Sequence, residues 1–114
     1  MSDCLFCKIV KKEIPSNIVF ETDDVLAFRD INPKAPVHIL VIPKLHIGSF
    51  AEIKQEHSAL LMKMIKMIQD IAKKEGIDQS GFRIVANNGP DAGQAVAHLH
   101  FHVIGGRPLK WPPG

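Results

Sequence analysis

The sequence predicts an α+β fold with one antiparallel sheet of about five strands and one main amphipathic helix. Three observations support this fold class. Short β-rich runs are bounded by turn formers, one long segment carries apolar residues at three- and four-residue steps, and a strictly alternating run lies close to the C-terminus. A chain of 114 residues suits one domain with a real core, so we expect residues 1–114 to form a single domain.

The first half of the chain predicts three strands. Residues 18–22 and 25–29 are β-rich runs separated by two aspartates, a pattern typical of an antiparallel hairpin. Two prolines then force a loop over residues 32–36. Residues 38–42 form an almost continuous apolar run that Pro43 ends, which indicates a strand buried on both faces at the centre of the sheet.

The main helix is predicted from about Gln55 to Glu75, with Gly76 as its cap. Met62 and Met67 fall outside its main apolar stripe. They either cover a second surface, such as a partner helix, or fill gaps in the core, and the first alternative favours a homodimer. The stripe itself consists of Leu60, Leu61, Met64, Ile65, Ile68, Ile71 and Ala72.

The last part of the chain predicts two more strands and a loop. Residues 82–86 are β-rich, and residues 87–94 are so dense in turn formers that they must form a loop. Residues 97–104 alternate strictly and end at two glycines, which indicates a final strand. The tail, residues 107–114, is too rich in proline for regular structure and is expected to be extended.

Composition excludes several classes of protein without naming a function. Hydrophobic residues make up 46% and charged residues 23%, close to the averages for globular proteins. The formal net charge of +2 is spread along the chain, which argues against duplex nucleic acid as a partner. Because no apolar run reaches the roughly 18 residues of a membrane span, we expect no membrane association and a cytoplasmic location.

Three histidines carry the strongest chemical signal. A strand repeats every second residue, so His98, His100 and His102 are expected on one face at intervals of about 6.6 Å. Three interpretations are open: a solvated polar face, a metal held by His100 and His102, and nucleophilic attack on phosphorus by a neutral imidazole. The glycine- and amide-rich loop just upstream favours the third, because it offers N–H donors to phosphate oxygens.

Cys4 and Cys7 form a Cys-x-x-Cys pair, and they are the only cysteines in the chain. In a reducing compartment such a pair indicates a metal site or a redox-active site. Two reduced, buried cysteines are the alternative.

Residues 93–106 resemble the signature of the histidine triad family, whose motif is His-φ-His-φ-His-φ-φ. Residues 27–46 extend the similarity, and the closing Trp111-Pro112-Pro113-Gly114 resembles the Hint-like branch. The resemblance implies a homodimer that hydrolyses adenosine 5′-phosphoramidates or aminoacyl adenylates to AMP through a nucleotidyl-histidine intermediate. A non-catalytic nucleotide-binding scaffold or sensor, and a dinucleoside polyphosphate hydrolase, are the alternatives.

The resemblance also assigns roles to individual residues. His100 matches the nucleophile, His102 contacts the α-phosphate and helps the leaving group depart, and His38 buttresses both. Asp30 matches the acid that binds the ribose hydroxyls. The remaining matches are the apolar walls around the purine base, at Phe6, Ile9, Phe28, Ile31 and Leu40, and the phosphate loop, at Asn87, Gly93, Gln94 and Ala95.

Three further expectations come from the same resemblance. A microbial subset of the family carries zinc on positions matching Cys4, Cys7, His46 and His98, so a structural zinc is implied, with no metal required for the chemistry. The tail, residues 107–114, is expected to dock on the partner subunit at its active site. The Hint-like branch often carries serine where this chain has Ala95, which implies an altered leaving-group preference or a lower rate.

Overall fold

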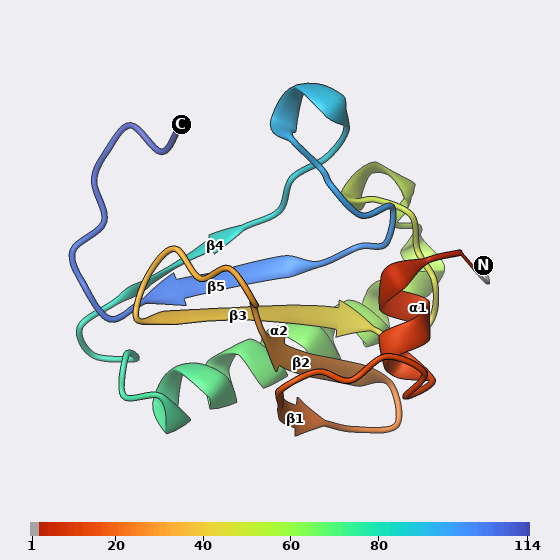
Figure 1. Cartoon of the computed structure of the whole chain (residues 1–114), viewed down its shortest axis with the longest axis horizontal. Helices are drawn as coiled ribbons and strands as arrows, with labels where there is room; N and C mark the ends of the chain where they lie inside the picture. The colour runs from red at the N-terminus through yellow and green to blue at the C-terminus, as the bar shows by residue number, and fades with distance from the viewer. Residues whose placement is uncertain (1–2) are drawn as a thin grey trace.

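The structure, a computed structural model, describes residues 3–114 and consists of one antiparallel sheet between two helices (Figure 1). The strands follow the order β1-β2-β3-β5-β4, and every neighbouring pair is antiparallel. This confirms the predicted fold class. The elements in chain order are α1 (Leu5–Val10), β1 (Ile18–Glu21), β2 (Val25–Arg29), β3 (Val37–Pro43), α2 (Ser58–Lys74), β4 (Phe82–Val85) and β5 (Phe101–Gly105), with short 3-10 turns at Phe50–Glu52, Gln55–His57 and Pro90–Ala92.

Strand β3 is the middle of the sheet, and all seven of its residues are buried. Its side chains alternate between two cores, as a strand requires. Ile39 and Val41 pack into the core that α2 covers, whereas Leu40 and Ile42 pack on the opposite face together with Phe6 of α1. The prediction of a central strand buried on both faces is therefore confirmed.

Helix α2 covers one face of the sheet, and its buried residues differ from the predicted apolar stripe at two positions. Met67 is 5% exposed and belongs to the core, whereas Ile65, which was expected in the stripe, is 43% exposed. The reason is the rotation of about 100° per residue, which aligns Met64, Met67, Ile68 and Ile71 at i, i+3, i+4 and i+7. Ile65 lies beyond one edge of this arc.

Helix α1 was not predicted from the sequence. Its six residues are far fewer than the roughly 12 that an isolated helix needs, so tertiary contacts must hold it. Phe6 and Ile9 supply those contacts by packing on the sheet face opposite α2. Cys4 is the N-cap of the helix, and its Sγ accepts the Cys7 N–H over 3.4 Å.

The prediction of one strand over residues 97–104 is wrong at its N-terminal end. Strand β5 begins only at Phe101, whose Cα pairs with Val41. Extending the antiparallel register by two residues would bring Leu99 opposite Pro43, which has no N–H to continue the ladder. Leu99 instead donates its N–H to the carbonyl of Ile47 over 2.6 Å, and residues 96–98 form a bend.

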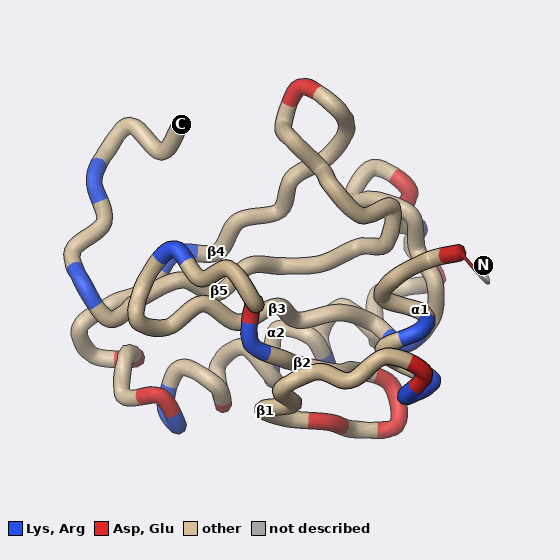
Figure 2. The backbone as a smooth tube through the Cα atoms, viewed as in Figure 1, with Lys and Arg blue, Asp and Glu red and all other residues tan. Residues whose placement is uncertain are grey.

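In the view of Figure 2, Lys and Arg lie near Asp and Glu over much of the backbone. Around β1 and α1, basic and acidic segments lie beside one another (Figure 2), and Lys12 and Lys44 both pair with Glu21. The C-terminal tail is irregular and mostly exposed, with Arg83 donating to the carbonyl of Lys110 over 3.0 Å. Within residues 3–114, no helix combines the length and apolar composition that crossing a bilayer requires.

Candidate active site and metal centre

A cavity of about 380 Å³ opens on the sheet face that α1 packs against. It brings together Asp30, His100, His102 and Ala95 with every apolar wall residue that the resemblance implied: Phe6, Ile9, Phe28, Ile31 and Leu40. Ile31 is fully exposed and lies at the mouth. Leu5, Ile14, Pro15, Ser16, Arg29 and Val96 also line the cavity and were missed, because they carry no distinctive chemical signal in the sequence.

His38 and His102 form a hydrogen-bonded chain whose direction follows from its first donor. The backbone N–H of Lys34 donates to Nδ1 of His38 over 3.0 Å. A neutral His38 must therefore carry its hydrogen on Nε2, which lies 2.9 Å from Nδ1 of His102. His102 accepts at Nδ1 and, when neutral, carries its own hydrogen on Nε2.

His100 is held in the complementary tautomer. Its Nδ1 lies 2.7 Å from the carbonyl oxygen of His98, so this nitrogen donates and Nε2 keeps a free lone pair. The ring is 7% exposed and stands edge-on to Phe6, with centroids 5.1 Å apart. A buried imidazole with one nitrogen anchored and a lone pair on the other has the form that a nucleophile needs.

Burial sets the charge state of this cluster. Desolvation, together with repulsion from His100 and His38, lowers the pKa of His102 to about 4, against a smaller opposing effect from Asp30. Desolvation also lowers the pKa of His38, and Asp30 opposes this as well. In the ligand-free protein both rings are therefore neutral near pH 7.

Asp30 follows directly after β2, and its two carboxylate oxygens make different contacts. One carboxylate oxygen, Oδ1, accepts the Asn32 N–H over 2.8 Å, as in a turn-forming aspartate. The other, Oδ2, lies 3.5 Å from Nε2 of His38. The same carboxylate lines the cavity, where it is able to accept hydrogen bonds from a ligand.

The loop between β4 and β5 contributes Ala95 and Val96 to the cavity, while Asn87, Gly93 and Gln94 lie outside its lining. Gly93 adopts the left-handed conformation with φ of 80°, which favours glycine. Among residues 3–114, the backbone N–H of Ala95 has no hydrogen-bond acceptor. Ala95 is exposed and lines the cavity.

A second group of side chains lies at the N-terminus of α1. Cys4 Sγ is 3.4 Å from Nδ1 of His98, Cys7 Sγ is 3.3 Å from Nδ1 of His46, and the two Nδ1 atoms are 3.2 Å apart. In a tetrahedral zinc site, ordinary bond lengths give edges of about 3.6 Å between sulfur and nitrogen and about 3.3 Å between nitrogens. The four residues therefore fit a closed Cys2His2 zinc site.

The environment of His98 supports this fit. Its Nε2 lies 2.8 Å from the carbonyl oxygen of Pro43 and donates to it, which leaves the Nδ1 lone pair for a metal. Burial lowers the pKa of His98, so the ring is neutral as a ligand must be. The alternative of two isolated reduced cysteines leaves the convergence of both histidines on the thiols unexplained.

A catalytic metal on His100 and His102 would compete with the hydrogen bonding of His102, whose Nδ1 accepts from His38 and whose Nε2 then carries a hydrogen. The second group with metal-ligand geometry among the described residues consists of Asp30, His38 and His102, without His100. A metal on Nε2 of His38 would displace the hydrogen that the Lys34 N–H keeps on that nitrogen. The protonation pattern therefore favours a hydrogen-bonded chain over a metal at this place.

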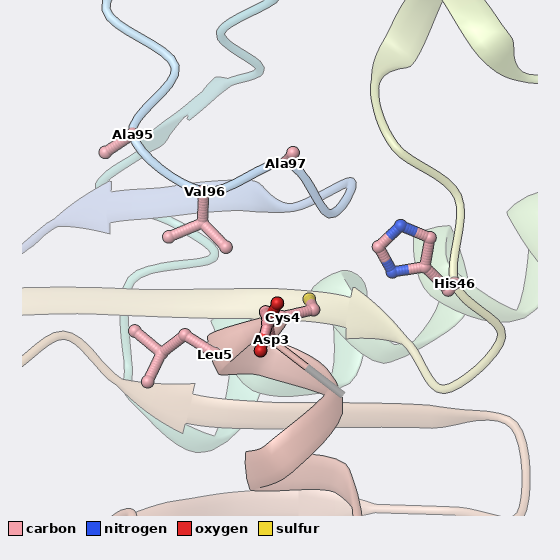
Figure 3. Close-up of a pocket in the computed structure, with 7 residues that line it drawn as sticks. All are labelled: Asp3, Cys4, Leu5, His46, Ala95, Val96 and Ala97. Carbon is pink, nitrogen blue, oxygen red and sulfur yellow. The ribbon is translucent and has the colours of Figure 1, made fainter. Parts of the chain in front are cut away.

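The metal centre and the cavity are neighbours that share structural parts. Phe6 stands edge-on to both His98 and His100, at 5.9 and 5.1 Å between centroids. A second pocket of about 570 Å³ lies between them, with Cys4 and His46 on one side and residues 95–97 on the other (Figure 3). Leu5, Ala95 and Val96 line both this pocket and the cavity.

Comparison with known proteins identifies the family. The chain is 52% identical over 114 residues to a 14 kDa zinc-binding protein of Brassica juncea, covering 98% of this chain and 100% of that protein. It is 50% identical over 115 residues to adenylylsulfatase HINT1 of Arabidopsis thaliana, covering 99% and 78% of the two chains.

Among solved structures, a HIT family hydrolase from Legionella pneumophila superposes with a TM-score of 0.97 at 46% identity, covering 98% of this chain and 100% of that one. The model of the HIT domain family matches residues 11–109, the range that contains the three histidines of the motif. The chain therefore belongs to the HIT family, as its sequence resemblance implied.

Proposed function

We propose that this protein is a purine nucleotide hydrolase that cleaves adenosine 5′-phosphoramidates and aminoacyl adenylates to AMP, with His100 as the nucleophile. The observation that carries the proposal is the pair of opposite tautomers in one buried cavity. His100 presents a lone pair on Nε2, and His102 beside it presents a hydrogen on Nε2. The Legionella protein is described as a HIT family hydrolase, which supports the same reaction class.

The cavity suits a purine nucleoside monophosphate. Its walls are largely aliphatic and aromatic, as a flat base requires, and its main acidic group is Asp30, which can accept hydrogen bonds from both ribose hydroxyls. The α-phosphate then lies against His100 and His102, beside Ala95. His38 does not touch the nucleotide in this arrangement but holds the tautomer of His102.

The proposed reaction has two balanced displacements. Nε2 of His100 attacks phosphorus, the P–N bond breaks, and the departing amine takes a proton from His102. The bound phosphate anion favours uptake of one further proton from solvent by the hydrogen-bonded His38–His102 pair, and the pair returns to its neutral state when the amine departs with this proton. Water then attacks phosphorus of the nucleotidyl-histidine, His102 takes a proton from the water, and the bond between phosphorus and Nε2 of His100 breaks. AMP leaves with His100 restored.

The test is turnover of a fluorogenic adenosine phosphoramidate by the wild type, His100→Ala and His57→Ala. We expect His100→Ala to lose about 10³-fold or more in kcat, since the covalent route is closed. His57→Ala, outside the cavity, should remain active. Acid quenching should trap an AMP adduct on His100, and activity should survive brief chelation. Nucleotide binding without turnover by the wild type would instead establish the scaffold alternative.

Adenylyl sulfate is a second candidate substrate, because the Arabidopsis relative is named adenylylsulfatase. Its leaving group is an anion that needs no proton, so His102 would matter less for departure. Parallel assays with adenylyl sulfate, a phosphoramidate and a dinucleoside polyphosphate therefore compare the three reaction classes. The substrate with the highest kcat/KM identifies the leaving group that the site favours.

We also propose that the protein binds one structural zinc per chain and forms a homodimer. The Cys2His2 geometry and the name of the Brassica relative support the zinc. Strand β4 is an edge strand with Ile84 49% exposed, and Trp111 in the tail is 79% exposed, which leaves apolar surface for a second copy and for docking of its tail. Cys4 and Cys7 are not joined in a disulfide, which suits a reducing compartment such as the cytoplasm.

A further inference from the structure

Gln94 links three backbone segments through its side-chain carboxamide. Oε1 accepts the N–H of Gly89 over 2.9 Å, and Nε2 donates to the carbonyls of Gly48 and Val96 over 2.9 and 3.0 Å. One N–H and two carbonyls match the one oxygen and one NH₂ group of the carboxamide, so its orientation is determined by its partners. Both of its donor hydrogens are already in use within the protein.

The backbone N–H groups around Gln94 are also hydrogen-bonded within the protein. Its own N–H donates to the carbonyl of Gly89 over 3.1 Å, and Gly93 N–H donates to the carbonyl of Pro90 over 3.0 Å. On the other side of the turn, Asn88 Oδ1 accepts the N–H of Ala51 over 2.7 Å. The loop is therefore tied at two points to residues 48–51, and one of these ties is Gln94.

The third partner of Gln94 lies at the active cavity. Val96, whose carbonyl accepts from Nε2 of Gln94, lines the cavity together with Ala95, His100 and His102. The same carbonyl also accepts the N–H of His98 over 2.9 Å, at the bend that precedes β5. A shift at Gln94 would therefore move both the cavity rim and the start of the histidine segment.

We infer that Gln94 is a positioning residue for the proposed reaction. Its carboxamide holds the β4–β5 loop against residues 48–51 and so fixes the cavity-lining Ala95 and Val96 in place, without contacting the nucleotide. The resemblance implied a nucleotide-binding role for Gln94, but its side chain has no free donor for a phosphate oxygen. Only the kinetic consequence of this inference rests on the proposed function, because the hydrogen bonds of the Gln94 side chain are present in the ligand-free protein.

The test combines Gln94→Leu with Gln79→Leu, a matched control at an exposed glutamine outside the loop. Amide hydrogen exchange in the ligand-free protein should become faster over residues 87–96 in Gln94→Leu, with α2 and β3 unchanged. With the phosphoramidate, kcat should fall on the order of 10²-fold, because displacement of about 1 Å costs that much. KM should stay within about threefold, since the base and ribose walls lie elsewhere.

Gln94→Glu provides a graded second variant that keeps the side-chain size. Its carboxylate still accepts from Gly89 but cannot donate to Gly48 or Val96. Amide hydrogen exchange should therefore increase more at the cavity-lining Ala95 and Val96 than at Gly89. Unchanged amide hydrogen exchange in both variants would refute the inference that Gln94 holds the loop in place, whether or not the wild type hydrolyses the phosphoramidate. Faster exchange with unaltered kcat would overturn its catalytic role, and lost AMP affinity with unaltered exchange would establish direct contact. Absence of wild-type turnover refutes the proposed function alone.

Discussion

His102 should make the protein lose stability in mild acid. Desolvation, with repulsion from His100 and His38, lowers its pKa to about 4 from the ordinary 6.5. Between these two values the unfolded chain holds more protons on this imidazole than the native protein does. Stability therefore rises with pH across this window and is lost as the pH falls from 6.5 to 4.

The size of the effect follows from the shift. The difference of about 2.5 pH units between 6.5 and about 4 corresponds to about 3 kcal/mol, at about 1.4 kcal/mol for each unit. The ring is half-buried, and solvent screening reduces this figure to about 2–3 kcal/mol. Nearly all of this loss should be complete at pH 4.

Urea unfolding at pH 7 and pH 4 measures the effect in the wild type, His102→Gln and His57→Gln. Between pH 7 and pH 4, the decrease in the free energy of unfolding should be about 2–3 kcal/mol smaller in His102→Gln than in the wild type, because glutamine does not titrate. Acid release of the metal affects all three proteins and cancels in this difference. His57→Gln should follow the wild type. Equal losses in the wild type and His102→Gln would refute the reasoning.

Three other predictions concern the metal, the core and the leaving group. Cys7→Ser should lower bound zinc and Tm and raise KM for the nucleotide, because α1 carries Phe6; elemental analysis showing less than about half an equivalent per wild-type chain would contradict the site. Met67→Ala should destabilise by about 2–4 kcal/mol and the exposed Met62→Ala by less than about 0.5, as measured by urea unfolding. Ala95→Ser should change relative kcat/KM across amine leaving groups by supplying a hydroxyl, and identical ratios would show that this position is neutral.

Local patterns were sufficient to predict most of the sheet and the main helix. The hairpin at β1 and β2 and the central position of β3 follow from alternation, turn residues and one uniformly apolar run. The residues that make up each pattern lie close together in the sequence, so the pattern can be recognised without knowledge of the tertiary contacts. The family signature likewise depends on a short contiguous segment, residues 93–106.

Elements held by distant contacts were not predictable in the same way. Helix α1 is too short to show a clear apolar periodicity in the sequence. It forms because Phe6 and Ile9 pack on the sheet face opposite α2. The start of β5 depends on Pro43 in another strand, and the inward turn of Met67 depends on where α2 meets the sheet. Each of these outcomes is decided by a partner remote in sequence.

The sequence by itself determined that three histidines alternate along one segment and that two cysteines lie three positions apart. Only the tertiary structure decided how these residues divide their work. It brings His38 within 2.9 Å of His102, 64 positions away, and Cys4 within 3.4 Å of His98, 94 positions away. Tautomers, pKa values and metal geometry depend on distances between atoms in space, and packing of the sheet against α1 determines those distances.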